Sequence, residues 1–103
     1  SMAETSRVDS PMLDKLVGTY LDTENNKNEV TFFKHDNTLW MKNQTFGYRF
    51  VYTGDNRFES YGTPPKKPWT LHFEIQPSGD IKLTENWTDM NLVNHTFISM
   101  KEK

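Results

Sequence analysis

The sequence predicts an all-β domain, namely an antiparallel up-and-down barrel of about eight strands with one short helical turn at its N-terminal side. Short segments of alternating polarity recur about every ten residues, a spacing typical of β-barrels and β-sandwiches. Turn-forming residues separate nearly all of these segments, so consecutive strands should be antiparallel neighbours. A closed meander would also hide the strand edges, and this favours a barrel.

The helical turn is expected just before the first strand. Ser10 can cap it and Pro11 can start it, because a serine hydroxyl accepts an N-terminal N–H and proline has φ already fixed. Gly18 should end it, and the turn should close one end of the barrel. Residues 1–9 are polar, lack the apolar run of a signal peptide and are interpreted as a disordered lead or a tag or linker remnant. Residues 10–103 are interpreted as one domain.

The strands follow from the turns that separate them. Asp36 and Asn37 suit the positive φ angles of a two-residue hairpin, and 54–56 and 77–80 are further strong turns. The segment 63–68 holds three prolines and should be a stiff loop that could act as a lid. The expected strands are 18–23, 29–35, 38–43, 48–53, 57–62, 69–76, 81–86 and 93–100.

Alternation assigns the faces of these strands. In 69–75 every second residue is apolar, which turns Leu71, Phe73 and Ile75 inward. An eight-stranded barrel is either filled by side chains or holds one small ligand, and the many large inward residues favour a mostly filled interior. We expect a cleft at the end opposite the helical turn. The other residues predicted to point inward are Val30, Phe32, Leu39, Met41, Phe50, Tyr52, Phe58, Ile81 and Leu83.

A two-residue turn at Asp36 and Asn37 places Phe32 opposite Met41. The same register pairs Phe33 with Trp40 on the outer face of the barrel. Such a pair is either local sheet packing or, because large exposed apolar patches usually have a use, part of a partner surface.

Composition narrows the function classes. The chain has 103 residues, enough for one core, and its aromatic residues (14%) supply large core side chains. A net charge of −2 without a basic stripe argues against nucleic-acid binding. Without cysteine there is no disulfide, thiolate nucleophile or zinc–cysteine site. No segment reaches the 18 apolar residues of a membrane span, so we expect a soluble domain.

Several segments resemble one family. They are 16–20 (LVGTY), 37–41 (NTLWM), 53–58 (TGDNRF) and 71–81 (LHFEIQPSGDI). Together they are similar to the small lipocalin-like domain of unknown function found at the C-terminus of serine β-lactamase-like and penicillin-binding-protein-like hydrolases. The resemblance covers about residues 12–102, and LVGTY is also similar to lipocalins, fatty-acid-binding proteins and avidins. It implies a barrel fold, a hydrolase neighbour and, if that hydrolase is exported, a bacterial periplasmic or extracellular location.

No catalytic or metal site can be recognised. The hydrolases' catalytic Ser-x-x-Lys does not occur here, so the resemblance carries over no catalytic residue. The histidines lack metal-ligand spacing; His35 and His72 should face outward, and the orientation of His95 stays open. Glu85 and Asp89 flank Trp87 and could form a carboxylate pair, but we expect them to be solvated. We therefore expect neither enzymatic activity in this domain nor a cofactor or metal.

Two functions remain. The first is an accessory domain that contacts a hydrolase domain or associates with itself through an outer sheet face, with Phe33 and Trp40 as candidate contacts. The second is a carrier of a small apolar ligand, of the lipocalin or fatty-acid-binding type. Rings with a polar tip suit the half-wet mouth of a barrel. The residues expected to line such a site are Tyr48, Tyr52, Tyr61, Trp69 and Trp87.

Overall fold

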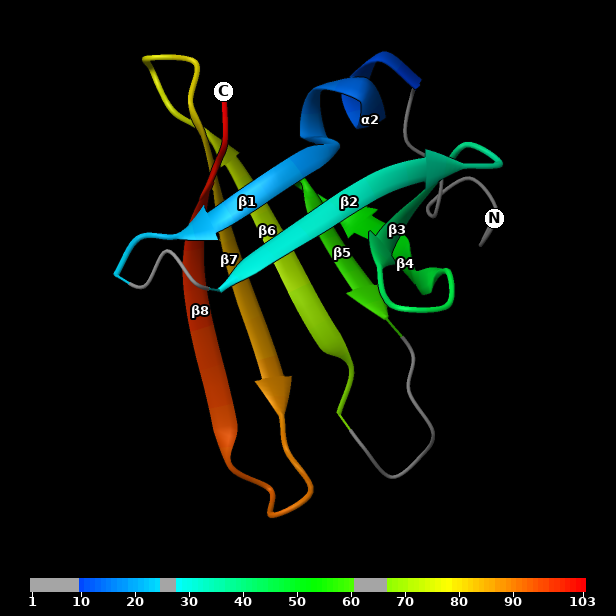
Figure 1. The fold of residues 1–103 in the computed structure, drawn as a ribbon, viewed down its shortest axis with the longest axis vertical. Coiled ribbons are helices and arrows are strands. Elements are labelled where there is room, and N and C mark those ends of the chain that lie inside the picture. The colour runs from blue at the N-terminus through cyan, green and yellow to red at the C-terminus, as the bar shows by residue number, and fades with distance from the viewer. Residues whose placement is uncertain (1–9, 25–27, 61–66) are drawn as a thin grey trace.

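The computed structural model describes residues 10–24, 28–60 and 67–103, which form a closed barrel of eight strands beside one short helix (Figure 1). Each strand pairs antiparallel with the next, and β8 returns to pair with β1. The predicted up-and-down barrel with a short N-terminal helix is thus confirmed. The elements are α2 (Ser10–Leu16), β1 (Gly18–Asp22), β2 (Glu29–His35), β3 (Thr38–Lys42), β4 (Gly47–Gly54), β5 (Arg57–Ser60), β6 (Trp69–Ile75), β7 (Ile81–Thr88) and β8 (Asn94–Lys101).

Where the strand bounds differ from the prediction, they differ by one or two residues. The strand predicted to stop at Asn86 continues to Thr88, because Trp87 pairs with His95 and Thr88 pairs with Asn94. Such ends depend on the partner strand, which local sequence does not reveal. Part of the strand predicted over 57–62, and most of the proline-rich segment 63–68, lies outside the described residues.

Two hairpins have the turn geometry that the sequence predicts. Asp36 and Asn37 have φ angles of 51° and 57°, and Asp55 and Asn56 have φ angles of 52° and 58°. Two consecutive positive φ angles match the right-handed twist of the strands, and Asp and Asn tolerate them well. The first turn sets the predicted register, with Phe32 opposite Met41.

Helix α2 closes one end of the barrel, as predicted. Leu13 and Leu16 are fully buried in the core, and the Tyr20 hydroxyl donates a hydrogen bond of 2.7 Å to the Leu16 carbonyl. On the outside, Lys101 Nζ donates to the Lys15 carbonyl (2.8 Å). The helix ends at Leu16, and Gly18, which begins β1, has a φ of +134° that suits glycine. The capping role proposed for the Ser10 side chain lies outside the described atoms.

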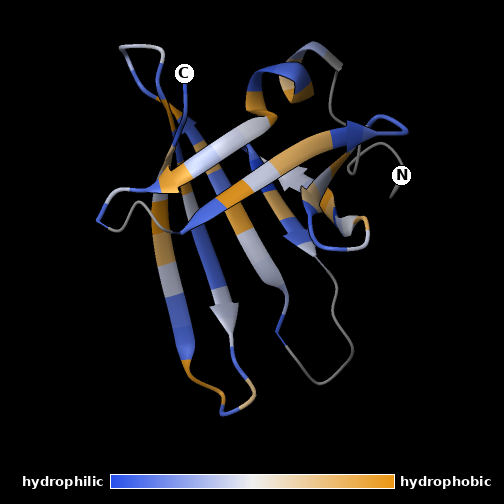
Figure 2. Cartoon of the chain, in the orientation of Figure 1, coloured by the Kyte–Doolittle hydropathy of each residue, from blue (hydrophilic) through white to orange (hydrophobic). Residues whose placement is uncertain are grey.

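The core is densest near this closed end. The Phe73 ring meets the rings of Tyr20, Phe32 and Phe58 edge to face, with centroids 5.5 to 5.7 Å apart. Apolar and polar residues alternate along the strands (Figure 2), as the period of two predicts. Ile75 is the register partner of the buried Ile81, but it is 46% exposed, because it is the last residue of β6 and lies beyond the packed layer.

Candidate functional site

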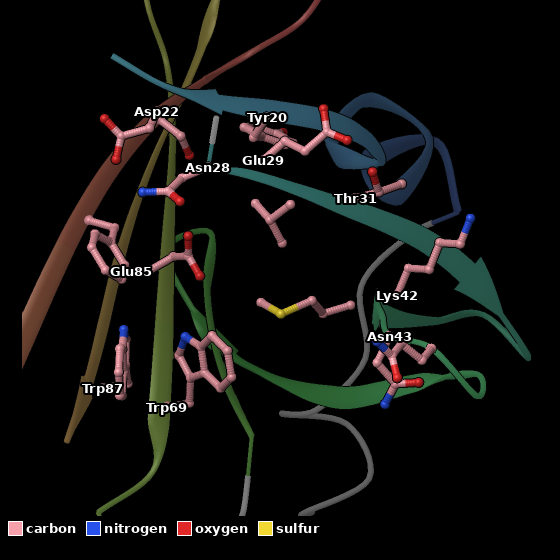
Figure 3. A pocket seen from close by; sticks show the side chains of 15 residues that line it. Tyr20, Asp22, Asn28, Glu29, Thr31, Lys42, Asn43, Trp69, Glu85 and Trp87 are labelled. Carbon is pink, nitrogen blue, oxygen red and sulfur yellow. The ribbon is translucent and has the colours of Figure 1, made fainter. Parts of the chain in front are cut away.

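A pocket of about 660 Å³ opens inside the barrel, at the end opposite α2 (Figure 3). In an up-and-down barrel the ends of alternate strands meet at the same end, here the C-terminal ends of β1, β3, β5 and β7 (Figure 1). The pocket therefore lies where the cleft was predicted. The closed half of the interior is filled by side chains, whereas this half is not.

Aromatic rings from three neighbouring strands build one wall of the pocket. Trp69 begins β6, Trp87 lies near the end of β7 and Phe97 lies on β8. The Trp69 and Trp87 ring centroids are 6.2 Å apart, and those of Trp87 and Phe97 are 6.0 Å apart. Three apolar or aromatic side chains of β1, β2 and β3 also line the pocket, namely Tyr20, Val30 and Met41.

Glu85 is the buried acid of the pocket. Its neighbours on the inward face of β7 are Leu83 and Trp87, and only 6% of Glu85 is exposed. The pKa of this carboxyl is raised to about 7, mainly by burial and to a smaller extent by the charge of Asp22. The indole N–H of Trp69 faces the carboxyl and lowers its pKa somewhat. The two groups do not reach hydrogen-bond geometry, since the indole nitrogen is buried without a partner among the described atoms.

Ser99 adds a second polar group to the same interior. Its register partners are Leu83 and Asp22, and it is 4% exposed. Its hydroxyl oxygen, like the Trp69 indole nitrogen, is buried without a hydrogen-bond partner in the described part of the chain. A buried polar group left unsatisfied costs about 1 to 3 kcal/mol, so water or a ligand must meet these groups.

The charged groups that line the pocket are mostly acidic. Asp22, Glu29 and Glu85 carry carboxyl groups, and Lys42 contributes an ammonium group. Figure 3 shows these side chains around the same opening, with Asp22 and Glu29 near β1 and β2 and Lys42 farther along, near β3. The excess of carboxyl groups disfavours an anion and favours a cation.

The loop after β7 holds the outer end of the aromatic wall in place. The His95 ring stacks on Trp87 with centroids 4.4 Å apart, and His95 Nε2 lies 2.8 Å from Asp89 Oδ2. Asp89 Oδ1 accepts hydrogen bonds from the backbone N–H groups of Asn91 and Val93. The His95 hydrogen bond and these backbone donors hold the pKa of Asp89 below its ordinary value. The orientation of His95, left open by the sequence, is therefore toward the pocket rim.

The predicted ligand-binding residues divide into three groups. Trp69 and Trp87 line the pocket, as expected. Tyr48 is 49% exposed and contacts Trp69 with a centroid distance of 6.0 Å, but it is not a lining residue. Tyr52 was wrongly assigned to the mouth: it contacts Phe58 near the closed end, because β4 runs away from the opening. Tyr61 lies outside the described residues.

The polar residues of the pocket were not predicted. Glu85 was expected to be solvated, but it continues the alternation of Ile81 and Leu83 and is buried. That alternation was the available signal, and extending it by one more position would have turned Glu85 inward. Ser99 carries no comparable signal, because its face depends on the register with β7.

The ring of Phe46, which the prediction did not include, packs against the outer-face pair of Phe33 and Trp40. Phe33 and Trp40 are register partners with ring centroids 6.4 Å apart, as predicted. The loop after β3 brings Phe46 edge-on against both rings, at 5.1 Å from each. Phe33 and Trp40 are therefore half-buried rather than exposed, and Phe46 is the exposed ring, at 48%. These three residues and His35, which contacts Trp40 and Phe46, form the outer aromatic cluster.

Other site types and known proteins give no further assignment. Among the described residues, no three or more His, Asp or Glu side chains gather as a metal ion would require. Within those same ranges no helix is long and apolar enough to cross a membrane. Comparisons with protein families, with curated proteins and with solved structures found no match. The resemblance to the lipocalin-like domain of serine hydrolases therefore stays a prediction.

Proposed function

We propose that this chain is a binding protein that holds one small molecule in the open half of its barrel. A single observation carries the proposal: the Glu85 carboxyl, the Ser99 hydroxyl and the Trp69 indole N–H lie buried around one pocket, the last two without partners in the described structure. Cores rarely keep such groups, because apolar side chains could fill the space without the penalty. A ligand that forms hydrogen bonds with these buried polar groups would offset the cost of burying them. The aromatic wall supplies the apolar contact area that small-molecule sites usually have.

An uncharged, environment-sensitive dye such as Nile red tests this proposal. The dye should bind the intact chain, and Ser99→Leu should weaken binding about tenfold or more by filling the pocket. Thr84→Leu is the matched control, because Thr84 alternates with Leu83 and Glu85 and so lies on the outer face of β7. Equal affinities of both variants and the original chain would place the dye elsewhere and count against the proposal.

We further propose that binding is not coupled to catalysis. The chain contains no Ser-x-x-Lys and no cysteine. Ester, amide and β-lactam substrates should therefore show no turnover. Turnover that persists through repurification and disappears in Glu85→Gln or Ser99→Ala would contradict this.

A second candidate function is docking on a partner, for which the outer aromatic cluster is the specific support. Phe46 exposes an apolar ring above Phe33 and Trp40. The partner that the resemblance implies is a serine β-lactamase-like hydrolase domain, and self-association is the alternative. Phe46→Ser should weaken association by about 2 kcal/mol if the ring is an anchor. Sedimentation of the chain alone, and of the chain mixed with such a hydrolase domain, would measure this; unchanged association would remove the candidate.

A further inference from the structure

From the chemistry of the lining, and on the premise that the pocket binds a ligand, we infer that the ligand is a small organic cation. Its ammonium group would pair with the Glu85 carboxylate, and its apolar body would lie along the wall formed by Trp69, Trp87 and Phe97. This assigns the ligand class that the proposed function leaves open.

The first argument is the position of Glu85. Glu85 is only 6% exposed inside the barrel, and no basic side chain forms an ion pair with it in the described structure. A buried carboxylate without a positive partner is unfavourable, and a ligand ammonium would provide that partner together with charge-assisted hydrogen bonds. The Ser99 hydroxyl, 4% exposed and unpartnered, lines the same pocket and can accept a hydrogen bond from the cation.

The second argument is the aromatic wall. A cation over the face of an aromatic ring is attracted by the negative potential of that face, and tryptophan is the most effective ring. Trp69 and Trp87 lie side by side here, 6.2 Å apart, and the stacked His95 ring holds the outer face of Trp87. A carboxylate beside two indoles suits an ammonium ion with an apolar body.

The third argument excludes the opposite charge. Among the described residues, the charged groups that line the pocket with Glu85 are Asp22 on β1, Glu29 on β2 and Lys42 on β3. Tyr20 also lines the pocket, its hydroxyl donates to Leu16, and His95 lies at the rim. With Glu85, three carboxyl groups face one ammonium group, so a fatty acid or other carboxylate ligand would meet repulsion.

The inference also predicts a measurable release of protons when the ligand binds. Burial places the pKa of Glu85 at about 7, so near pH 7 about half of the free molecules carry a proton on this carboxyl. A bound ammonium favours the ionised form, so binding should release about half a proton per molecule at pH 7. A neutral ligand of the same shape has no charge to displace that proton.

Calorimetry with three matched probes tests the inference on the intact chain. The probes are 2-(1-naphthyl)ethylamine, which is a cation, 2-(1-naphthyl)ethanol, which is neutral, and 3-(1-naphthyl)propanoate, which is an anion. The cation should bind about 10- to 100-fold more tightly than the neutral probe, as expected for a charge-assisted contact. Titrations at pH 7 in two buffers of different ionisation enthalpy measure the released protons.

Glu85→Gln supplies the residue-level test. The variant should bind the cation within about threefold of the neutral probe, and its affinity for the neutral probe should stay within about threefold of the original. Glu74→Gln is the matched control, because Glu74 alternates with Phe73 on β6 and faces outward. If Glu85→Gln fails to fold, the preference of the original chain for the cation over the neutral and anionic probes still tests the ligand class.

The outcomes separate the two proposals. Both the binding function and the cationic ligand class are supported if the original chain prefers the cation and releases protons on binding it, and if Glu85→Gln loses that preference. If the neutral or anionic probe binds more tightly, the ligand class is wrong while the binding function stands. Tight binding of the cation that is unchanged in Glu85→Gln also overturns the inference, since the ammonium is then not at Glu85. If neither the three probes nor Nile red binds, both proposals fail.

Discussion

The two ends of the barrel use the same strands in different ways, and β7 shows this most clearly. Its four inward residues are Ile81 and Leu83 in the closed half, then Glu85 and Trp87 in the open half. Near α2 the buried hydroxyl of Tyr20 is satisfied by the Leu16 carbonyl. In the open half, the Ser99 hydroxyl and the Trp69 indole N–H lack partners among the described atoms. The closed half therefore stabilises the fold, whereas the open half keeps polar groups that do not contribute to stability in this way.

The largest effect should come from the closed half. Phe73→Ala should cost about 3 to 5 kcal/mol, because it removes the ring that Tyr20, Phe32 and Phe58 all contact. Thr70→Ala, on the outer face of the same strand, should cost less than about 1 kcal/mol. Denaturant melts of both variants measure the difference. Equal losses would overturn the assignment of Phe73 to the inner face and Thr70 to the outer face.

The open half should instead destabilise the fold as pH rises. The pKa of Glu85 is raised from 4.5 to about 7 in the folded state, so between these values the folded chain binds more protons than the unfolded chain. Stability should therefore fall by about 3 kcal/mol from pH 4.5 to pH 7 and change little from this cause at higher pH.

Melts at several pH values compare the original chain with Glu85→Gln. The variant should lose this decline and should be the more stable of the two at pH 8, because no charge remains to be buried. A variant that shows the same decline as the original chain would mean that Glu85 is not the group responsible.

A smaller effect should follow from breaking the bond between β1 and α2. Tyr20→Phe keeps the ring in the core but leaves the buried Leu16 carbonyl without the hydroxyl that now donates to it at 2.7 Å. The loss should be about 1 to 2 kcal/mol, typical of a buried hydrogen bond whose partner stays behind. Burial raises the pKa of the Tyr20 hydroxyl, so this bond should persist in mildly alkaline solution. A loss above that of Phe73→Ala would contradict the ranking of these contacts.

The smallest effect should come from the surface ion pair of α2. Asp14 and Lys34 approach to 2.8 Å, but their side chains are 61% and 35% exposed. Exposed pairs contribute about 0.2 to 1 kcal/mol and weaken with salt. Asp14→Asn should therefore lower stability by less than about 1 kcal/mol, and the difference should shrink in 1 M salt. A large, salt-independent loss would show that α2 is held by this contact rather than by Leu13 and Leu16.

The sequence by itself determined the eight strands, their antiparallel order and the closure of one end by α2. These features depend on local rules: the period of two, the Asp-Asn turns and the helix stop at Gly18. The register between Phe33 and Trp40 followed from turn length alone, and the cleft was expected opposite the helical turn because that turn closes the other end.

Only the tertiary structure decided which inward residues are buried and which polar groups meet. Alternation gives the direction of a side chain but not its depth, so Ile75 points inward yet lies exposed, and Glu85 proves to be buried. Tyr52 and Trp69 have similar character, but only Trp69 reaches the pocket, because position along the barrel axis separates them. Glu85 and Ser99 line the same pocket because of the pairing of β7 with β8. Contacts between strands follow from the summed register of the barrel, which no single segment of sequence contains.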